Sequence, residues 1–137
     1  MHWGSKYINL YNFSREVKYL NGDLLDKEYW NGLIKMSLSR LFILRVLYDE
    51  SSHGYALTKK IADLTSGCCA PTEGTLYPAL REFEQGGYLS SHKEVVSGRE
   101  RKVYALTEKG IKAYKTALDA WEETARVLLT AQKEMQT

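Results

Sequence analysis

The sequence has few of the residues that mark secreted, metal-binding or membrane-spanning proteins. Its 137 residues include two cysteines and three histidines. Cys68 and Cys69 are adjacent, so they cannot form the cross-links of a small secreted protein, and this fits a reducing compartment. There is no run of about 18 uncharged apolar residues, and residues 3–20 lack the apolar segment of a signal peptide. We therefore expect a cytoplasmic protein that makes no use of a membrane.

Proline is rare, and neither sign of charge dominates. The only prolines are Pro71 and Pro78, so most of the chain is free to form long helices. Lysine and arginine total 19 against 17 acidic residues, and the net charge of +2 does not by itself indicate a nucleic-acid partner. Apolar residues make up 44% of the chain, as in ordinary globular proteins. A chain of this length can build one core but not two.

Apolar residues at helical spacing predict three helices in the first two thirds of the chain. The first fits residues 28–48 and is apolar around most of its circumference, and the second fits 55–65. The third fits 73–85, with Thr72 as its N-cap. If this helix starts at its first residue, Pro78 removes one hydrogen bond; if it starts later, Pro78 lies in the first turn.

After the third helix the apolar pattern changes to a period of two. Residues 88–96 and 102–106 read as strands, and 97–101 read as the turn between them. This predicts a β-hairpin. Thr107 follows it as the N-cap of a long final helix.

The final helix, residues 108–137, carries a heptad repeat. Such a helix is too long to be covered by one small domain, so we expect part of the repeat to pair with a second copy of the chain. The repeat contains Ile111, Tyr114, Leu118, Trp121, Ala125, Leu128, Gln132 and Met135.

Residues 1–27 form an N-terminal arm with weak periodicity and, we expect, a short helix over 13–20. The role of the arm stays open. Its aromatic residues are unfavourable in water, so the arm could wrap the partner subunit. These residues are Trp3, Tyr7, Tyr11 and Phe13.

The order helix, helix, helix, hairpin, long helix predicts a mainly α (α+β) fold. It is the order of a winged helix-turn-helix, here over residues 28–107, in which the third helix enters the major groove of DNA and the hairpin is the wing. Segment 88–106 has four basic and two acidic residues, an excess of two that equals the net charge of the whole chain. The excess lies at a hairpin that can reach phosphates, although basic hairpins are also common solvated turns.

Three groups of residues are candidates for DNA contact. The third helix offers a hydroxyl, a phenol and a guanidinium for bases or phosphates. The second helix offers two lysines for the DNA backbone, and the wing offers three cations. The alternative for each group alone is an ordinary exposed surface. The residues of the third helix are Thr75, Tyr77 and Arg81. Those of the second helix are Lys59 and Lys60, and those of the wing are Arg99, Arg101 and Lys102.

Three motifs make the chain resemble the PadR family of transcriptional regulators. They are HGY at residues 53–55, PTEGTLYPAL at 71–80 and GRERKVYALTEKG at 98–110. The resemblance covers about residues 36–110, and the chain resembles the branch with one long C-terminal helix. Val103 stands where the wing of the family often has an aromatic residue, and the arm is not covered.

The resemblance implies a homodimeric repressor that binds a pseudo-palindromic operator in double-stranded DNA and is released by a small aromatic effector. Trp121 is similar in position to an aromatic residue that lines an effector pore between subunits in multidrug-sensing relatives. The alternative for Trp121 is simple packing in a dry interface. The dimer interface expected from the heptad comprises Ile111, Tyr114, Leu118, Trp121, Ala125 and Leu128.

Two other classes of function compete with DNA binding: a protein-interaction module and a drug-binding protein with little affinity for DNA. No nucleophile with a partnering base, phosphate-binding loop or set of metal ligands is recognisable, so we expect no enzyme, metal or cofactor. Cys68 and Cys69, just before the third helix, either sense soft ions or redox state or form a tight turn with one thiol buried.

Overall fold

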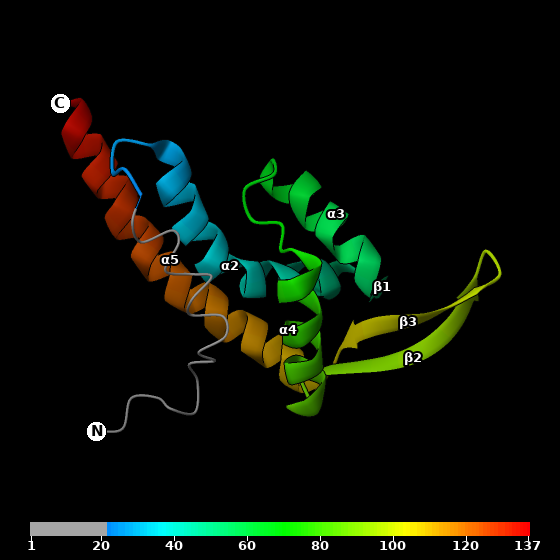
Figure 1. Cartoon of the computed structure of the whole chain (residues 1–137). Helices are drawn as coiled ribbons and strands as arrows, with labels where there is room; N and C mark the ends of the chain where they lie inside the picture. The colour runs from blue at the N-terminus through cyan, green and yellow to red at the C-terminus, as the bar shows by residue number, and fades with distance from the viewer. Residues whose placement is uncertain (1–21) are drawn as a thin grey trace, which may run out of the picture.

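The computed structural model describes residues 22–137. The predicted helix at 13–20 and the aromatic residues of the arm lie outside this range. Within this range lie three helices, a β-hairpin and a long last helix, in the predicted order (Figure 1). No helix within residues 22–137 is both long and apolar enough to cross a bilayer. The elements are α2 (Lys27–Asp49), β1 (Ser52–His53), α3 (Gly54–Thr65), α4 (Glu73–Gln85), β2 (Leu89–Val96), β3 (Arg99–Leu106) and α5 (Glu108–Gln136).

Helix α2 is the centre of the fold. Asp26 caps it by accepting a hydrogen bond from the backbone N–H of Glu28 at 2.9 Å. Its C-terminal half is buried on two sides, as the nearly continuous apolar pattern predicts. One side belongs to the main core, with α3, α4 and the sheet; the other, through Leu41 and Leu44, packs against Tyr114 of α5.

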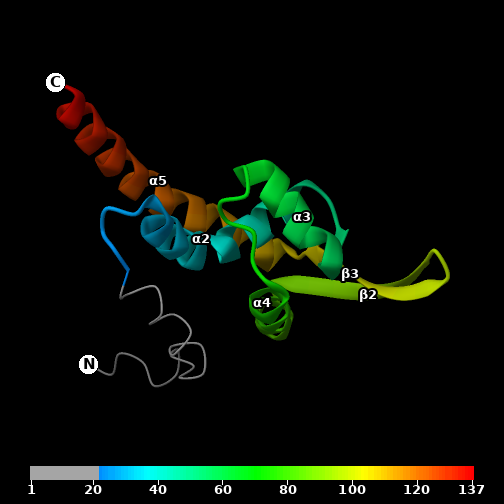
Figure 2. The same ribbon diagram turned by 45° about the horizontal axis from the view of Figure 1, so that its top comes forward.

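The sheet has three antiparallel strands in the order β1-β3-β2. The predicted five-residue turn at 97–101 is wrong, because β3 already begins at Arg99, which pairs with Val96. Ser97 and Gly98 both have positive φ angles, of 52° and 76°, and two such residues close a hairpin without further ones. The wing therefore projects well past α3 and α4 (Figure 2).

Strand β1 was not predicted. It has only two residues, of which His53 pairs with Val103 and Ser52 with Tyr104. These pairs join the start of α3 to the base of the wing. The pairing therefore fixes the wing relative to the first helix of the helix-turn-helix.

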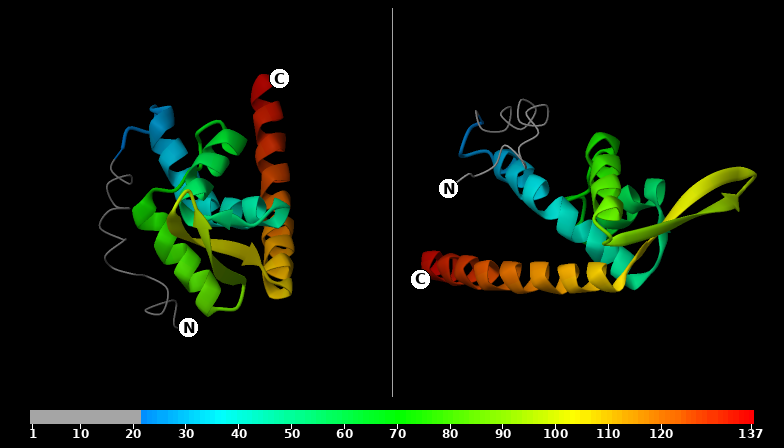
Figure 3. Two further views of the ribbon diagram at one scale, coloured as in Figure 1. Left: turned by 90° about the vertical axis from the view of Figure 1, so that its right-hand side faces the viewer. Right: turned by 90° about the horizontal axis from the view of Figure 1, so that it is seen from below.

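Helix α5 begins as predicted, with the Thr107 hydroxyl accepting a hydrogen bond from the N–H of Gly110 at 3.1 Å. Its first turns pack on α2. Trp121 is the last residue of α5 that is partly buried, and every residue from 122 to 137 is exposed. The C-terminal half of α5 and the N-terminal half of α2 extend toward the same end of the molecule and diverge there (Figure 3).

Candidate nucleic-acid interface

Helix α4, the predicted recognition helix, has the bounds that its sequence pattern indicates. Leu76 and Leu80 are completely buried and hold the helix against the main core. Its other face is open: Thr75 and Arg81 are exposed, and the Tyr77 side chain is 36% exposed. The predicted contact residues of α4 therefore share an accessible surface.

The start of α4 settles the alternatives for Pro78. The helix begins at Glu73, so the missing N–H of Pro78 removes the hydrogen bond that the Gly74 carbonyl would accept. Gly74 is exposed, and water or a polar ligand can reach that carbonyl. Thr72 lies at the N-cap position, but its hydroxyl contacts the Thr75 hydroxyl at 3.1 Å and does not cap the backbone.

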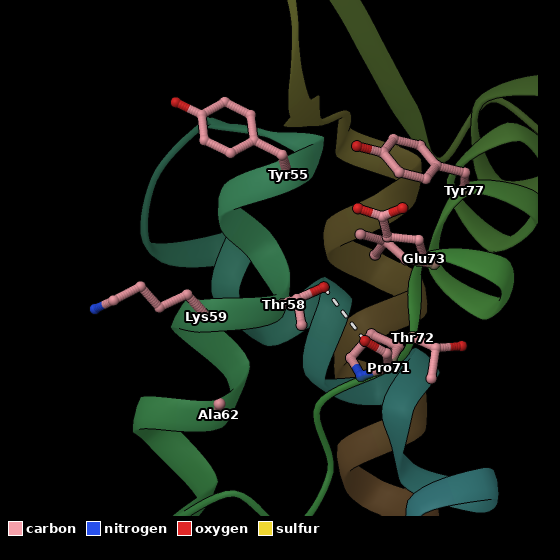
Figure 4. A pocket seen from close by; sticks show the side chains of 9 residues that line it. Tyr55, Thr58, Lys59, Ala62, Pro71, Thr72, Glu73 and Tyr77 are labelled. Atoms are coloured by element: carbon pink, nitrogen blue, oxygen red, sulfur yellow. Dashed lines mark hydrogen bonds between the residues drawn. The ribbon is translucent and has the colours of Figure 1, made fainter.

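A cleft of about 340 Å³ separates α3 from the start of α4 on this surface (Figure 4). Its two walls are joined by the Thr58 hydroxyl, which donates to the Pro71 carbonyl at 3.3 Å. The side chains of Glu73 and Tyr77 lie together along the α4 wall. Burial, and secondly the Glu73 carboxylate, raises the pKa of Tyr77. Like any tyrosine, Tyr77 can donate a hydrogen bond at neutral pH.

The wing is attached to the helices by two contacts that involve its cations. The Arg101 guanidinium lies over the Tyr55 ring, 4.4 Å from its centroid, and His53 stacks on the same ring at 5.6 Å. Lys102 Nζ donates to Glu84 of α4 at 2.7 Å. The orientation of the wing is therefore coupled to both helices of the helix-turn-helix.

The Glu84 carboxylate is the centre of the second contact. It accepts hydrogen bonds from Lys102 and from the Ser91 hydroxyl, which together hold its pKa below the ordinary value. The same pairing raises the pKa of Lys102. Lys102 is therefore already paired within the chain, whereas the exposed Arg99 at the wing tip forms none of the ion pairs recorded within residues 22–137.

The two lysines of α3 are also paired within the chain. Lys59 contacts Asp63 at 3.1 Å, one turn later on the exposed side of the helix. Lys60 donates to Glu50 at 3.0 Å and to the Ser52 hydroxyl at 3.1 Å, which ties α3 to the loop after α2. Their contact with the DNA backbone stays a prediction, and it requires these lysines to share or exchange partners.

The residues of the predicted dimer seam divide into two sets. Tyr114 is buried within its own chain against α2, and Trp121 packs beside it, partly buried. Burial raises the pKa of Tyr114. Ile111 and Leu118 are about two-fifths exposed, and the seam residues beyond Trp121 are open. Tyr114 therefore contributes to the core of one chain before any partner binds.

Sequence reasoning missed several residues that shape these surfaces. Tyr55 and Glu84 position the wing, but a contact between distant elements leaves no local pattern. Other residues that were not singled out could have been recognised in the sequence. They are exposed apolar residues beside the heptad of α5 and around the start of α2. These exposed residues are Val127 and Leu129 on α5, Leu24 and Leu25 just before α2, and Trp30 in the first turn of α2.

Comparison with known proteins agrees with this geometry. Residues 43–116 match the Transcriptional regulator PadR-like family. The transcriptional regulator Rv3488 of Mycobacterium tuberculosis is 40% identical over 93 residues, which cover 68% of this chain and 84% of that protein. The transcriptional regulator YqjI of Escherichia coli is 44% identical over 71 residues, which cover 52% of this chain and only 33% of that protein.

Solved structures share the fold. A transcriptional regulator from Clostridium thermocellum aligns with a TM-score of 0.63 and 32% identity, over 69% of this chain and 93% of that one. A PadR family transcription regulator from Clostridium difficile aligns with a TM-score of 0.58 and 25% identity, over 66% and 94%. The predicted winged helix-turn-helix with a long C-terminal helix is confirmed. The chain belongs to the PadR-like family of transcriptional regulators and is a DNA-binding protein.

Proposed function

We propose that the protein is a homodimeric repressor whose α4 helices read two half-sites of an operator and whose wings hold the flanking phosphates. The observation that carries this proposal is the continuity of the exposed face of α4 with the wing, through the contact of Glu84 with Lys102. One rigid unit thereby presents a groove-sized helix beside an exposed cationic hairpin.

The assignment of roles follows the exposure of each side chain. Thr75, Tyr77 and Arg81 have the donors and acceptors to contact bases or phosphates from α4. Arg99 and Arg101 supply positive charge from the wing, which is the kind of contact that fixes a protein on DNA without reading sequence. Specificity is therefore assigned to the helix, and most of the salt-dependent affinity to the wing.

The second chain is proposed to cover the open halves of α2 and α5. Leu128 and Leu129 of α5 are 63% and 64% exposed, and Trp30 of α2 is 48% exposed. Apolar side chains gathered on two diverging helices of one small domain are unfavourable in water, and a twofold-related copy can bury both at once. Such a dimer sets a fixed spacing between the two α4 helices.

Trp121 is the proposed contact for a small aromatic effector. It lies where α5 leaves the core of its own chain, next to Tyr114 and Leu44 and partly open. An aromatic compound that stacks on this indole would touch both the core and the partner chain. Its binding can therefore change the angle between the two DNA-binding units.

Footprinting on the intergenic DNA beside the gene, with and without a panel of aromatic compounds, tests the proposal. We expect protection of two half-sites about one helical turn apart, and loss of protection with at least one compound. Protection that no compound relieves would contradict the effector role of Trp121 and leave the operator assignment standing.

Two alternative functions make different predictions for the same DNA. A winged helix that binds proteins would not retard the upstream DNA in a gel even at low salt. A drug-binding protein would show quenching of Trp121 fluorescence by aromatic compounds without any release of DNA. Retardation that a quenching compound reverses would contradict both alternatives.

A further inference from the structure

The loop between α3 and α4 carries both cysteines of the chain, and neither has a role in the contacts described above. The Cys69 side chain is 2% exposed and belongs to the main core cluster with Ile61 and Leu76. Cys68 is partly exposed beside that cluster. The sulfur atoms of Cys68 and Cys69 are in direct contact. Two free thiols therefore lie side by side, one reachable from solvent and one in the core.

The backbone of this loop is tied to the helices at both of its ends. The N–H groups of Cys68 and Cys69 donate to the carbonyl and the hydroxyl of Thr65, both at 3.2 Å. At the other end the Pro71 carbonyl accepts from Thr58. Helix α4 begins two residues after Pro71. The segment that holds the sulfur atoms is therefore tied to α3 and leads, within a few residues, into the start of the recognition helix.

The two adjacent sulfur atoms restrict which metal or metalloid ion could bind to them. Within residues 22–137 no group of three or more potential metal ligands is present, so a tetrahedral zinc-type site is not available. A linear two-coordinate ion needs its donors on opposite sides, which adjacent residues do not offer. A pyramidal arsenic(III) centre with one organic group leaves two neighbouring positions for soft sulfur donors. This geometry matches the paired thiols.

We propose that Cys68 and Cys69 chelate a trivalent organoarsenical and that the chelate releases the protein from DNA; the release rests on the proposed repressor function. The arsenical enters as the oxide, R–As=O. Two S–As bonds form, the As=O bond breaks, and the two thiol protons leave with the oxygen as water. Arsenic stays trivalent throughout, so the step needs no oxidant or reductant.

The two thiols react in a defined order. Burial, and secondly the contact with Cys68, raises the pKa of Cys69 to about 12, so this thiol stays neutral and unreactive while the loop is closed. Cys68 therefore forms the first bond. The second bond requires Cys69 to leave the core cluster, because close-packed interiors have no room for an organic arsenic group. The chelate thereby favours an open loop and a displaced α4.

Titration of the full-length protein with phenylarsine oxide tests the chelate, and intact mass spectrometry provides a readout that does not involve DNA. We expect one phenylarsenic group per chain, bound with loss of one water. A dithiol such as 2,3-dimercaptopropanol should remove it, and a monothiol such as glutathione should not. The Cys68→Ser variant keeps the core thiol of Cys69 in place and should form no stable adduct.

A gel shift on the operator tests the release. We expect phenylarsine oxide to lower the affinity of the wild type by about tenfold or more and to leave that of Cys68→Ser unchanged. An adduct that survives in Cys68→Ser, or that glutathione removes from the wild type, overturns the chelate. An adduct that leaves operator affinity unchanged overturns the coupling to α4. Failure of the untreated protein to bind DNA contradicts the proposed function instead, and the mass measurement still decides the chelate.

Discussion

Gly110 shows how closely α5 approaches the base of the wing. A Cβ atom at this position would lie 2.1 Å from the Tyr88 carbonyl oxygen and 2.9 Å from the Leu106 side chain. The first of these is a backbone atom, which cannot rotate away. The glycine that ends the third motif thus marks a helix packed directly on the chain that enters β2.

We predict that Gly110→Ala lowers the free energy of unfolding by about 1–3 kcal/mol, the usual cost of forcing an extra methyl group into a packed site. Denaturation in urea, followed by circular dichroism, measures the change. Lys112→Ala, an exposed substitution on the same helix, should change stability by no more than about 0.5 kcal/mol. Equal stability of the two variants would mean that the contact at Gly110 relaxes freely.

Glu84 gives the wing contact a defined dependence on pH. Its pKa is lowered in the folded protein, first by the hydrogen bond from Lys102 and then by that from Ser91. The stabilisation from this carboxylate is therefore present above its unfolded-state pKa and is lost as the pH falls through the lowered folded-state pKa.

We predict that Glu84→Gln destabilises the protein near neutral pH and that the difference from the wild type vanishes in acid below the lowered pKa. Urea denaturation of both proteins across the acid range measures this difference. Ser90→Ala, an exposed change in β2, serves as a control without pH dependence. A difference that persists unchanged in acid would show that the charge of Glu84 does not hold the wing.

At the scale of elements, the helices were predictable because each carries its own apolar pattern. The third helix has its predicted bounds, the first extends one residue further at each end, and the second begins one residue earlier. Strand β1 and the short wing turn were not predictable in the same way. A two-residue strand exists only because β3 is beside it, and the turn depends on Ser97 adopting a positive φ that serine rarely takes.

The stack of Arg101 on Tyr55 is expected to orient the wing through its aromatic ring. We predict that Tyr55→Leu lowers operator affinity about two- to fivefold, the value of an exposed cation–π contact, whereas Tyr55→Phe keeps most of the affinity. Fluorescence anisotropy with labelled operator measures both variants. Equal decreases in the two would assign the effect to the hydroxyl group and not to the ring.

The tip of the wing should set the salt dependence of binding. We predict that Arg99→Ala with Arg101→Ala weakens operator binding and flattens the plot of log affinity against log salt by about 0.9 for each phosphate that the variant no longer neutralises. A salt titration of the double variant measures the slope. Lys115→Ala removes an exposed cation of α5 that is outside the predicted DNA-contact groups and should leave the slope unchanged. An unchanged slope in the double variant would mean that the wing does not bind phosphates.

At the scale of the whole molecule, the heptad indicated an interface along the last helix. It did not indicate which heptad residues are already packed within their own chain. Tyr114 and Trp121 fit the heptad and yet pack against α2 of their own chain, because the first turns of this apolar stripe complete the core of a small domain. The site residues on α4 were recognisable as exposed. The pairing of basic site residues with acids on other elements, as for Lys60 and Lys102, depends on the folded arrangement alone.

We predict that Leu128→Glu weakens the dimer by at least about tenfold, since it places a charge in an apolar contact. Sedimentation equilibrium measures the association. Thr130→Glu adds the same charge on another side of α5 and should have a smaller effect, and both variants should retain the helical content of the wild type. A dimer constant unaffected by Leu128→Glu would place the interface elsewhere.

Helix α5 leaves the core at Trp121. This point divides the helix into a first part that packs on α2 and a second part that lies outside the packed core. All sixteen residues that follow are exposed, and none of them belongs to either core cluster of the described chain. Substitutions there can therefore alter the proposed dimer contacts with little effect on the packing of the winged helix-turn-helix. The proposed pairing of two chains and the packing of the DNA-binding unit thus depend on different parts of the same helix.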